Sequence, residues 1–490
     1  MAEGNGSTRA GNERFAAAAL SIGLFFDGTR NNARNLGHPG PPSTPRPPAA
    51  RSDDDSPYQS PPASSRDNGL TNVARLQALY PDSRTGWAGA PSLSIYVEGV
   101  GTRDGEEDDL IGLAFGIGAT GVRAKVERAL TTLLPAALAE LAAGTPPPLR
   151  SLQLDLFGYS RGGAAARDLA NQLRRWSAAQ WRNLLGNAGL ALHPEFAPAQ
   201  PVVRFIGLFD TVVAVSSAHA GDHPEVALPA AAADKVLQLV ARDEHRQHFA
   251  LTSVAPLHEE ILLPGVHASI GGGQDQAVEG PKLLSRPQRA ELRASGVGDF
   301  QTPALAVLHA SEAFTKAQLE AGRWREYLGL SEREVWVDVW HQWQQQRRAG
   351  SRSVQLAPVL YVSAAVVLKR SIDWRYTLIA LRLMQQRAAQ AGVPWLRAAD
   401  AIAEWVLPAP LLPIADCLLA GHALTEAQEA LLRRNYLLQS AHWNFDALGD
   451  TALTYAADAG VQELPYRPGP GLFYINRPTA DGQRIVLPNG

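Results

Sequence analysis

Residues 157–166 read Phe157-Gly158-Tyr159-Ser160-Arg161-Gly162-Gly163-Ala164-Ala165-Ala166. The stretch before them, 152–157, alternates apolar and polar residues as a strand does. The stretch after them, 164–176, is rich in alanine and places Leu169 and Leu173 four residues apart, as on one face of a helix. A Gly-x-Ser-x-Gly pattern between a strand and a helix is typical of a nucleophile elbow. The sequence therefore predicts that Ser160 is a catalytic nucleophile.

The neighbours of Ser160 fit this turn. Gly158 and Gly162 let the strand and helix backbones approach each other closely, because glycine has no Cβ atom. The backbone N–H of Arg161 is then available to bind an oxyanion. The alternative is that the motif is an ordinary strand–helix turn with no chemistry.

A serine nucleophile needs a base, and the base needs an orienting carboxylate. In α/β-hydrolases these residues follow the serine in the order acid, then histidine. The apolar stretch 202–209 predicts a strand that ends at Asp210, and acids at the carboxyl ends of parallel strands share one edge of the sheet. His267 follows the next predicted strand, 260–263, and precedes a glycine-rich loop. Alternatively, Asp210 is a turn or helix-capping residue and His267 an ordinary loop histidine.

A second oxyanion donor is expected at the end of the first predicted strand, which lies in the second half of residues 15–26. The backbone N–H groups of Gly28 and Thr29 follow this strand and should lie beside the elbow. For Asp27 we favour a structural role, in which its side chain caps the turn.

Several of these motifs together resemble a bacterial family of hydrolase-like domains that includes type VI secretion lipase effectors of the first family. The order and spacing of the motifs carry the resemblance, while each motif alone is weak. One position departs from the family pattern, since Ser269 stands where an acidic residue usually follows the histidine by two positions. The similar stretches are 24–32, 97–102, 157–167, 208–212, 264–273, Asp243-Glu244-His245-Arg246, 440–444, 474–478 and Gly482.

The resemblance implies an α/β-hydrolase-like fold, with a mostly parallel sheet flanked by helices. Long helical patterns after about residue 300 predict in addition a mainly helical C-terminal region or insertion. The resemblance also implies a Ser-Asp-His esterase acting on phospholipids, with Ser160 as nucleophile, Asp210 as acid and His267 as base. His442 is an alternative base, because α/β-hydrolase histidines often come late in the chain. Such a phospholipase A1 or A2 would be an antibacterial toxin with a cognate immunity protein and a spike carrier or adaptor in its producer. It would be made in the cytoplasm and delivered by type VI secretion to the periplasm or membrane of the target cell.

Composition and motif spacing exclude several classes of binding site. A formal net charge of −3 gives no basic footprint for nucleic acid. Cys417 is the one cysteine, which excludes an intramolecular disulfide and a cysteine-based zinc site. The Gly-x-Gly-x-x-Gly at 116–121 lacks a preceding strand, so we reject a dinucleotide site. The acidic stretch 104–109 lacks the spacing of a calcium loop and is interpreted as a solvated turn. We expect no cofactor and no metal.

The sequence predicts three regions. Residues 15–300 form the hydrolase core, with a Pro/Ser-rich loop at 37–67; residues 301–440 form a helical lid or membrane-contact region; residues 441–490 return to the core. Helices are expected at 302–327, 332–348, 364–391 and 394–405. Trp336, Trp340 and Trp343 would share one helix face that packs on the core or faces lipid headgroups, and 398–413 is a second candidate for lipid contact.

No secretory signal is found at the N-terminus and no apolar run is long enough to span a membrane. Two other functions remain open. One is hydrolysis of a soluble ester or thioester, and the other is a non-catalytic interaction module on a hydrolase fold.

Overall fold

A parallel sheet forms the centre of the chain. The computed structural model describes residues 18–37, 64–86, 89–215, 221, 223–292, 301–347, 356–444, 446–447, 472–473 and 475–489. The six parallel strands follow the order β2-β1-β3-β4-β5-β7 and are β1 Ala18–Phe26, β2 Ser92–Val97, β3 Leu149–Tyr159, β4 Val203–Phe209, β5 Lys235–Ala241 and β7 Glu259–Leu263. This arrangement confirms the predicted α/β fold class. Most of the Pro/Ser-rich loop predicted at 37–67 lies outside the described residues.

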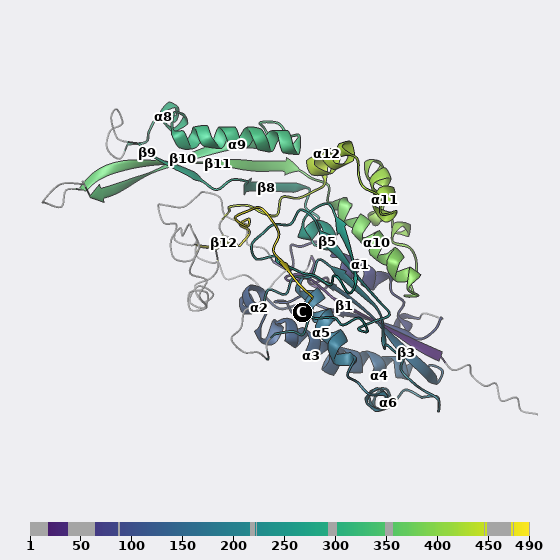
Figure 1. Cartoon of the computed structure of the whole chain (residues 1–490). Helices are drawn as coiled ribbons and strands as arrows, with labels where there is room; N and C mark the ends of the chain where they lie inside the picture. The colour runs from purple at the N-terminus through teal and green to yellow at the C-terminus, as the bar shows by residue number, and fades with distance from the viewer. Residues whose placement is uncertain are drawn as a thin grey trace, which may run out of the picture.

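Helices cover both faces of this sheet (Figure 1). Alternation along β1 explains why: Leu20, Ile22 and Leu24 belong to one buried apolar cluster, and Phe25 belongs to the other. The first cluster is closed by α3 Val122–Arg128, α4 Leu134–Ala143, α5 Arg161–Leu173 and α6 Ala178–Asn187. The second is closed by α1 Asn72–Leu79, α10 Thr377–Gln390, α11 Leu412–Leu419 and α12 Glu426–Asn435.

A second, antiparallel sheet projects from this core (Figure 1). Its strands are β8 Val278–Leu283, β9 Gln288–Leu292, β10 Val335–Arg347 and β11 Leu356–Ser371, with β11 paired to the other three. Helix α9 Glu312–Leu328 packs along β10 and β11, and the short α8 Leu305–His309 precedes it. The sheet thus begins before the predicted boundary at residue 300, because β8 and β9 pair with β11.

The structure corrects three of the predicted helices, since residues 394–405 form no α-helix but only short 3-10 turns at Ala399–Ala401 and Ala403–Trp405. Residues 335–347 and 356–371 are strands, so the helix expected at 332–348 is wrong and the one expected at 364–391 begins only at Thr377. The three tryptophans do not share a face. Trp336 and Trp340 pack near Leu283 and Val367, whereas Trp343 packs on the opposite side of the strand near Leu308. Alternating valines and aromatic residues favour the strand over the helix.

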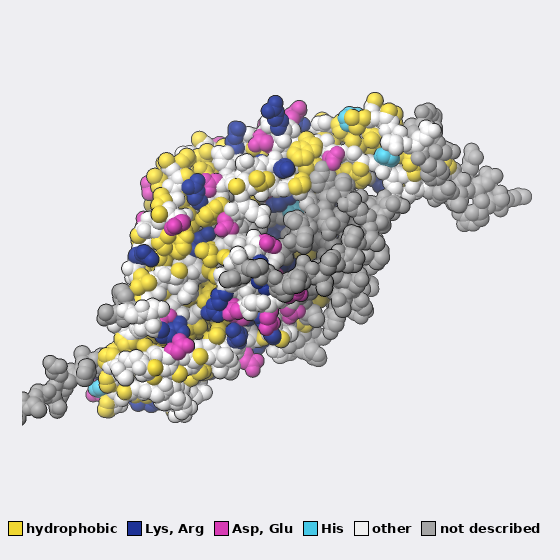
Figure 2. Space-filling model, turned by 180° about the vertical axis from the view of Figure 1, so that it is seen from behind, with side chains coloured by type: hydrophobic (Ala, Val, Ile, Leu, Met, Phe, Trp, Pro, Cys, Tyr) yellow, Lys and Arg dark blue, Asp and Glu magenta, His cyan; other side chains and the backbone are white. Residues whose placement is uncertain are grey.

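The segment 398–413 also differs from the expectation of a lid. It forms short 3-10 turns that precede α11, and Ala399, Trp405 and Leu411 are buried in the second apolar cluster of the core. Its packing places it among the helices that cover the parallel sheet. Val406 and Leu412 of this segment remain 49% and 45% exposed. Apolar side chains are also exposed at the projecting sheet, where hydrophobic groups gather near α8 (Figure 2) and Leu305 is 61% exposed.

The C-terminal segment returns to the core. Strand β14 Val486–Leu487 pairs in parallel with β6 Leu251–Thr252, and Pro478 pairs with Arg246 in an isolated bridge. The Asn489 side chain accepts a hydrogen bond from Arg167 of α5 at 2.7 Å. Residues more than two hundred positions apart are therefore joined at the rim of the parallel sheet. Among the helices of the described residues, none is both long and apolar enough to cross a membrane.

Candidate active site

Ser160 lies at the sharp turn between β3 and α5. Its backbone has φ 57° and ψ −127°, a region that non-glycine residues rarely adopt. The Ser160 N–H donates to the carbonyl of Phe209 at 3.1 Å, which links the turn to the end of β4. This strained strand–turn–helix geometry is that of a nucleophile elbow.

The two glycines of the motif make the turn possible. A Cβ atom at Gly162 would lie 2.3 Å from the carbonyl oxygens of Phe26 and Asp27, and one at Gly158 would lie 2.4 Å from the Gly162 oxygen. No side chain fits at such distances. The elbow is therefore packed directly against the end of β1.

Asp210 follows β4 in a left-handed conformation, with φ 49°. Its buried carboxylate accepts hydrogen bonds from His267 Nδ1 at 2.5 Å, from the Ala241 N–H at 2.9 Å, and from Arg484 Nη1 and Nη2 at 2.6 and 2.9 Å. Burial by itself would raise the pKa of Asp210, but the charge of Arg484 and the bond from His267 outweigh it and hold the pKa well below its usual range. The group is an ionised acceptor at neutral pH.

His267 is the first residue of α7 His267–Gly271 and is buried. Its ring centroid lies 4.7 Å from that of Tyr159, the residue before Ser160, and 5.1 Å from that of Phe249. Burial lowers the pKa of His267, partly opposed by the bond to Asp210, so the imidazole is neutral at neutral pH. Because Nδ1 donates to the carboxylate, Nε2 carries the lone pair that a general base needs.

The structure thus joins Asp210 to His267 and places the histidine ring beside the elbow. No hydrogen bond between His267 and the Ser160 hydroxyl is formed within the described residues. Such bonds are commonly long in unliganded sites and tighten with substrate.

Glu244 holds His267 through the histidine backbone. Its buried carboxylate accepts the backbone N–H of His267 at 3.2 Å and pairs with Arg246 Nε at 3.0 Å and Nη2 at 2.9 Å. Burial would raise the pKa of Glu244, yet Arg246 lowers it to about 2. The segment 243–246 forms no helix, Arg246 pairs with Pro478 in an isolated bridge, and only the resemblance to the lipase effectors indicated this segment.

The candidate oxyanion donors differ in availability. Arg161 is the first residue of α5, where a backbone N–H has no partner within the helix. The Thr29 N–H also donates to no group in the described part of the chain. The Gly28 N–H, in contrast, donates to Asp27 Oδ1 at 2.7 Å. Gly28 therefore departs from the expectation, because its N–H is already hydrogen-bonded to the side chain of the preceding residue.

Asp27 has the structural role that we favoured. Its carboxylate also accepts from Thr71 Oγ1 at 2.7 Å and from the Tyr96 hydroxyl at 2.5 Å, which fixes the turn after β1. Burial raises the pKa of Asp27 to about 6, although these three bonds lower it.

His442 lies apart from the acid. Its Nδ1 accepts the Asn444 N–H at 3.3 Å, and its own backbone N–H donates to the Asn476 carbonyl at 3.0 Å. Within the described residues it makes no hydrogen bond to Asp210, whose oxygens are already occupied. His442 thus orders the C-terminal loop in this structure.

The glycine-rich stretch 116–121 lies near the elbow, since a Cβ atom at Gly116 would lie 3.4 Å from Arg161 Nη1. It connects α2 Leu110–Phe115 to α3, and the Arg161 side chain donates to the carbonyls of Gly112 at 3.2 Å and Leu113 at 2.7 Å. Since a helix and not a strand precedes it, the geometry of a dinucleotide site is not present at this stretch. Nearby, Asp104, Asp108 and Asp109 accept hydrogen bonds from Asn32, Ser65 and Thr120.

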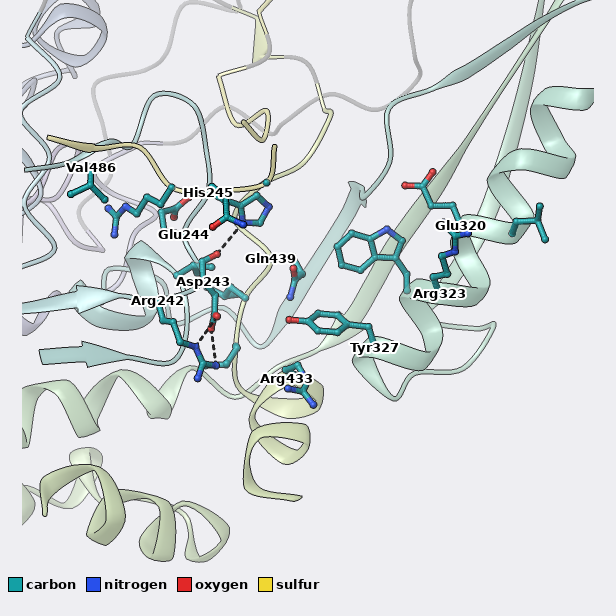
Figure 3. Close-up of a pocket in the computed structure, with 18 of the residues that line it drawn as sticks. Arg242, Asp243, Glu244, His245, Glu320, Arg323, Tyr327, Arg433, Gln439 and Val486 are labelled. Atoms are coloured by element: carbon teal, nitrogen blue, oxygen red, sulfur yellow. Dashed lines mark hydrogen bonds and ion pairs between the residues drawn. The ribbon is translucent and has the colours of Figure 1, made fainter. Parts of the chain in front are cut away.

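A cavity of about 960 Å³ lies between the segment 242–245 and helix α9 (Figure 3). Arg484 and Glu244, which hold the Asp210–His267 pair, line it, whereas Ser160, Asp210 and His267 do not. Trp324 and Tyr327 of α9 form the opposite wall. The cavity therefore separates the rim of the parallel sheet from the second sheet and its helix.

Comparisons with known proteins agree with this description. Residues 176–291 match the family described as "T6SS, Phospholipase effector Tle1-like, catalytic domain". No curated protein gives a match. The solved structure of a Tle1 effector bound to the VgrG spike from the type 6 secretion system is similar at a TM-score of 0.66 and 23% identity, covering 96% of this chain and 94% of that one.

An uncharacterized protein from Pseudomonas aeruginosa is a weaker structural neighbour, with a TM-score of 0.37 and 16% identity over 85% of this chain and 50% of that one. The likeness to the Tle1 effector shows that the two chains share a fold. The family match over residues 176–291 is to a domain of the kind that the sequence motifs resemble.

Proposed function

We propose that the protein is a serine esterase that hydrolyses acyl esters of membrane phospholipids, with Ser160 as nucleophile, His267 as general base and Asp210 as the orienting acid. The observation that carries the proposal is the 2.5 Å bond between Asp210 and a neutral, buried His267 at the rim that holds the strained Ser160. The match to a phospholipase effector family supports lipid as the substrate.

The reaction follows from these groups. His267 Nε2 takes the hydroxyl proton of Ser160 as Oγ attacks the ester carbonyl. Asp210 fixes the Nδ1–H tautomer and stabilises the imidazolium that forms. Backbone N–H groups of Arg161 and Thr29 bind the oxyanion, each typically contributing about 10²–10³ in rate. The imidazolium then protonates the leaving alcohol, and water hydrolyses the acyl-enzyme by the same steps.

The biological setting is part of the proposal. The structural neighbour is an effector bound to a VgrG spike, so we propose that a spike protein or its adaptor also carries this chain into a target cell. An immunity protein in the producing cell would protect that cell from the enzyme. We propose that the second sheet with α8 and α9 contacts the membrane, since Leu305 and Leu319 are strongly exposed on these two helices.

The test uses vesicles of phosphatidylethanolamine and phosphatidylglycerol, with products identified by mass spectrometry. Wild-type protein should release fatty acid and lysophospholipid, and the chain released distinguishes A1 from A2 cleavage. Ser160→Ala should release neither, while Ser151→Ala, half-buried on the same strand, should act as wild type. Turnover of a short soluble ester without lipid products would favour a small-ester or thioester hydrolase. Inactivity on both would favour an interaction module.

A further inference from the structure

We infer that Arg484, from the C-terminal segment, is a positioning residue for the reaction: it clamps Asp210 and thereby sets the protonation of His267. The inference rests on the proposed function and deepens it. Its guanidinium meets the carboxylate end-on, with Nη1 2.6 Å from Oδ1 and Nη2 2.9 Å from Oδ2. A bidentate pair of this kind fixes the orientation of a carboxylate as well as its charge.

The guanidinium is itself held in place. Nη1 also donates to the Ala241 carbonyl at 3.1 Å, and both Nε and Nη2 donate to the Phe249 carbonyl, at 3.2 and 3.1 Å. The Arg484 side chain is 8% exposed. Arg484 therefore joins the end of β5, the loop after it and Asp210 at one point.

The chain around Arg484 is fixed to the same rim. The Ile485 and Leu487 carbonyls accept the N–H groups of Leu251 and Ser253 at 2.9 Å each. In turn, the Thr252 N–H donates to the Thr211 carbonyl at 2.9 Å, directly after Asp210. The C-terminal segment thus continues the support of the acid and does not merely cover the surface.

The electrostatic consequence can be worked out from the neighbours of His267. Asp210 and Glu244 favour its protonated form, while Arg246 and burial oppose it. The phenol of Tyr159 also faces the ring, and burial keeps it protonated by raising its pKa. Arg484 compensates the charge of Asp210, so the carboxylate stays ionised in a buried site without forcing a proton onto His267. Removing Arg484 should therefore raise the apparent pKa of the Asp210–His267 pair.

The experiment compares wild type with Arg484→Met, Arg484→Lys and Asn489→Ala over a pH series of kcat/KM. The acid limb, where activity is lost as pH falls, should move up by about 1 pH unit in Arg484→Met. Arg484→Lys should keep the wild-type limb, because it keeps the charge, but lose part of kcat because it cannot form the bidentate pair. Asn489→Ala loosens the other end of the segment, where Arg167 and the Leu228 N–H donate to Asn489, and should leave the limb unmoved.

An Arg484→Met profile with the wild-type acid limb, or an equal shift in Asn489→Ala, would overturn the inference and leave Arg484 with a purely structural role. A second readout does not need catalysis. In the Ser160→Ala background, NMR titration of the His267 ring should show the same rise in pKa when Arg484→Met is added. If the His267 pKa rises by NMR but the wild-type protein hydrolyses no ester, the proposed function is contradicted and the role of Arg484 is supported. If the His267 pKa does not rise but the wild-type protein is an active esterase, the proposed function stands and the role of Arg484 is contradicted.

Discussion

The backbone N–H of His267 donates to the side chain of Glu244 at 3.2 Å, so a buried acid fixes the start of the short helix that presents the imidazole. The imidazole ring is fixed by Asp210, which accepts a hydrogen bond from Nδ1. The histidine is thus held through its main chain by one acid and through its ring by another. These two contacts keep the imidazole in position while it transfers a proton.

Glu244→Gln should lower stability in a pH-dependent way. The folded pKa of about 2 lies below the ordinary value of 4.5, so the ionised group contributes stability above pH 4.5 that is lost as pH falls towards 2. This contribution is roughly 3 kcal/mol at neutral pH. Urea unfolding of wild type and variant at pH 7 and pH 3 measures it. The gap between the two proteins should narrow at pH 3, and a gap that is constant with pH would contradict the account.

Asp210→Asn should reduce kcat by about 10⁴, because an amide at this place selects the wrong imidazole tautomer. It also leaves the Arg484 charge without its partner. Steady-state kinetics on a soluble ester gives the loss directly. A variant that retains a tenth of wild-type kcat would show that Asp210 is not the orienting acid.

The two histidines should separate function from stability. His267→Ala is expected to abolish hydrolysis while leaving secondary structure intact. His442→Ala should keep activity within about twofold and lose roughly 1–3 kcal/mol, because a buried backbone N–H of Asn444 loses its acceptor. Parallel activity and thermal unfolding measurements compare them. If only His442→Ala is inactive, the base has been assigned to the wrong residue.

Gly162→Ala should destabilise the fold by more than about 3 kcal/mol, since the added methyl group meets two backbone carbonyl oxygens at 2.3 Å. Gly186→Ala is the matched control in α6, where an added Cβ has no neighbour within 4 Å. It should be neutral or gain about 0.5–1 kcal/mol of helix stability. Equal unfolding midpoints for the two variants would mean that the elbow is not packed against β1.

Local sequence predicts the elbow, because the Ser160 motif and its flanking strand and helix lie within about ten positions of each other. Asp210 and His267 are candidates from apolar strands that end at one edge of a parallel sheet, and the resemblance to the lipase effectors selects them. Arg484 could not be predicted in this way. It meets Asp210 across 274 positions, and nothing in the sequence around residue 484 indicates which acid its side chain contacts.

Two of the departures from the sequence predictions, the strand at 335–347 and the Gly28 N–H, also have physical causes. The spacing of Trp336, Trp340 and Trp343 fits a helix face, but alternating Val335, Val337 and Val339 fit a strand, and pairing with β11 decided between them. For Gly28, the position beside the elbow agrees with the expectation, but the bond from its N–H to Asp27 depends on a side-chain rotamer that sequence does not give.

The most direct test of the serine mechanism is covalent labelling with an alkyl fluorophosphonate, followed by peptide mass spectrometry. The account predicts a single adduct on Ser160 in wild-type protein, and none in Ser160→Ala or, on the same timescale, in His267→Ala. An adduct on another residue, or no adduct in a folded wild-type protein that releases fatty acid from vesicles, would contradict it.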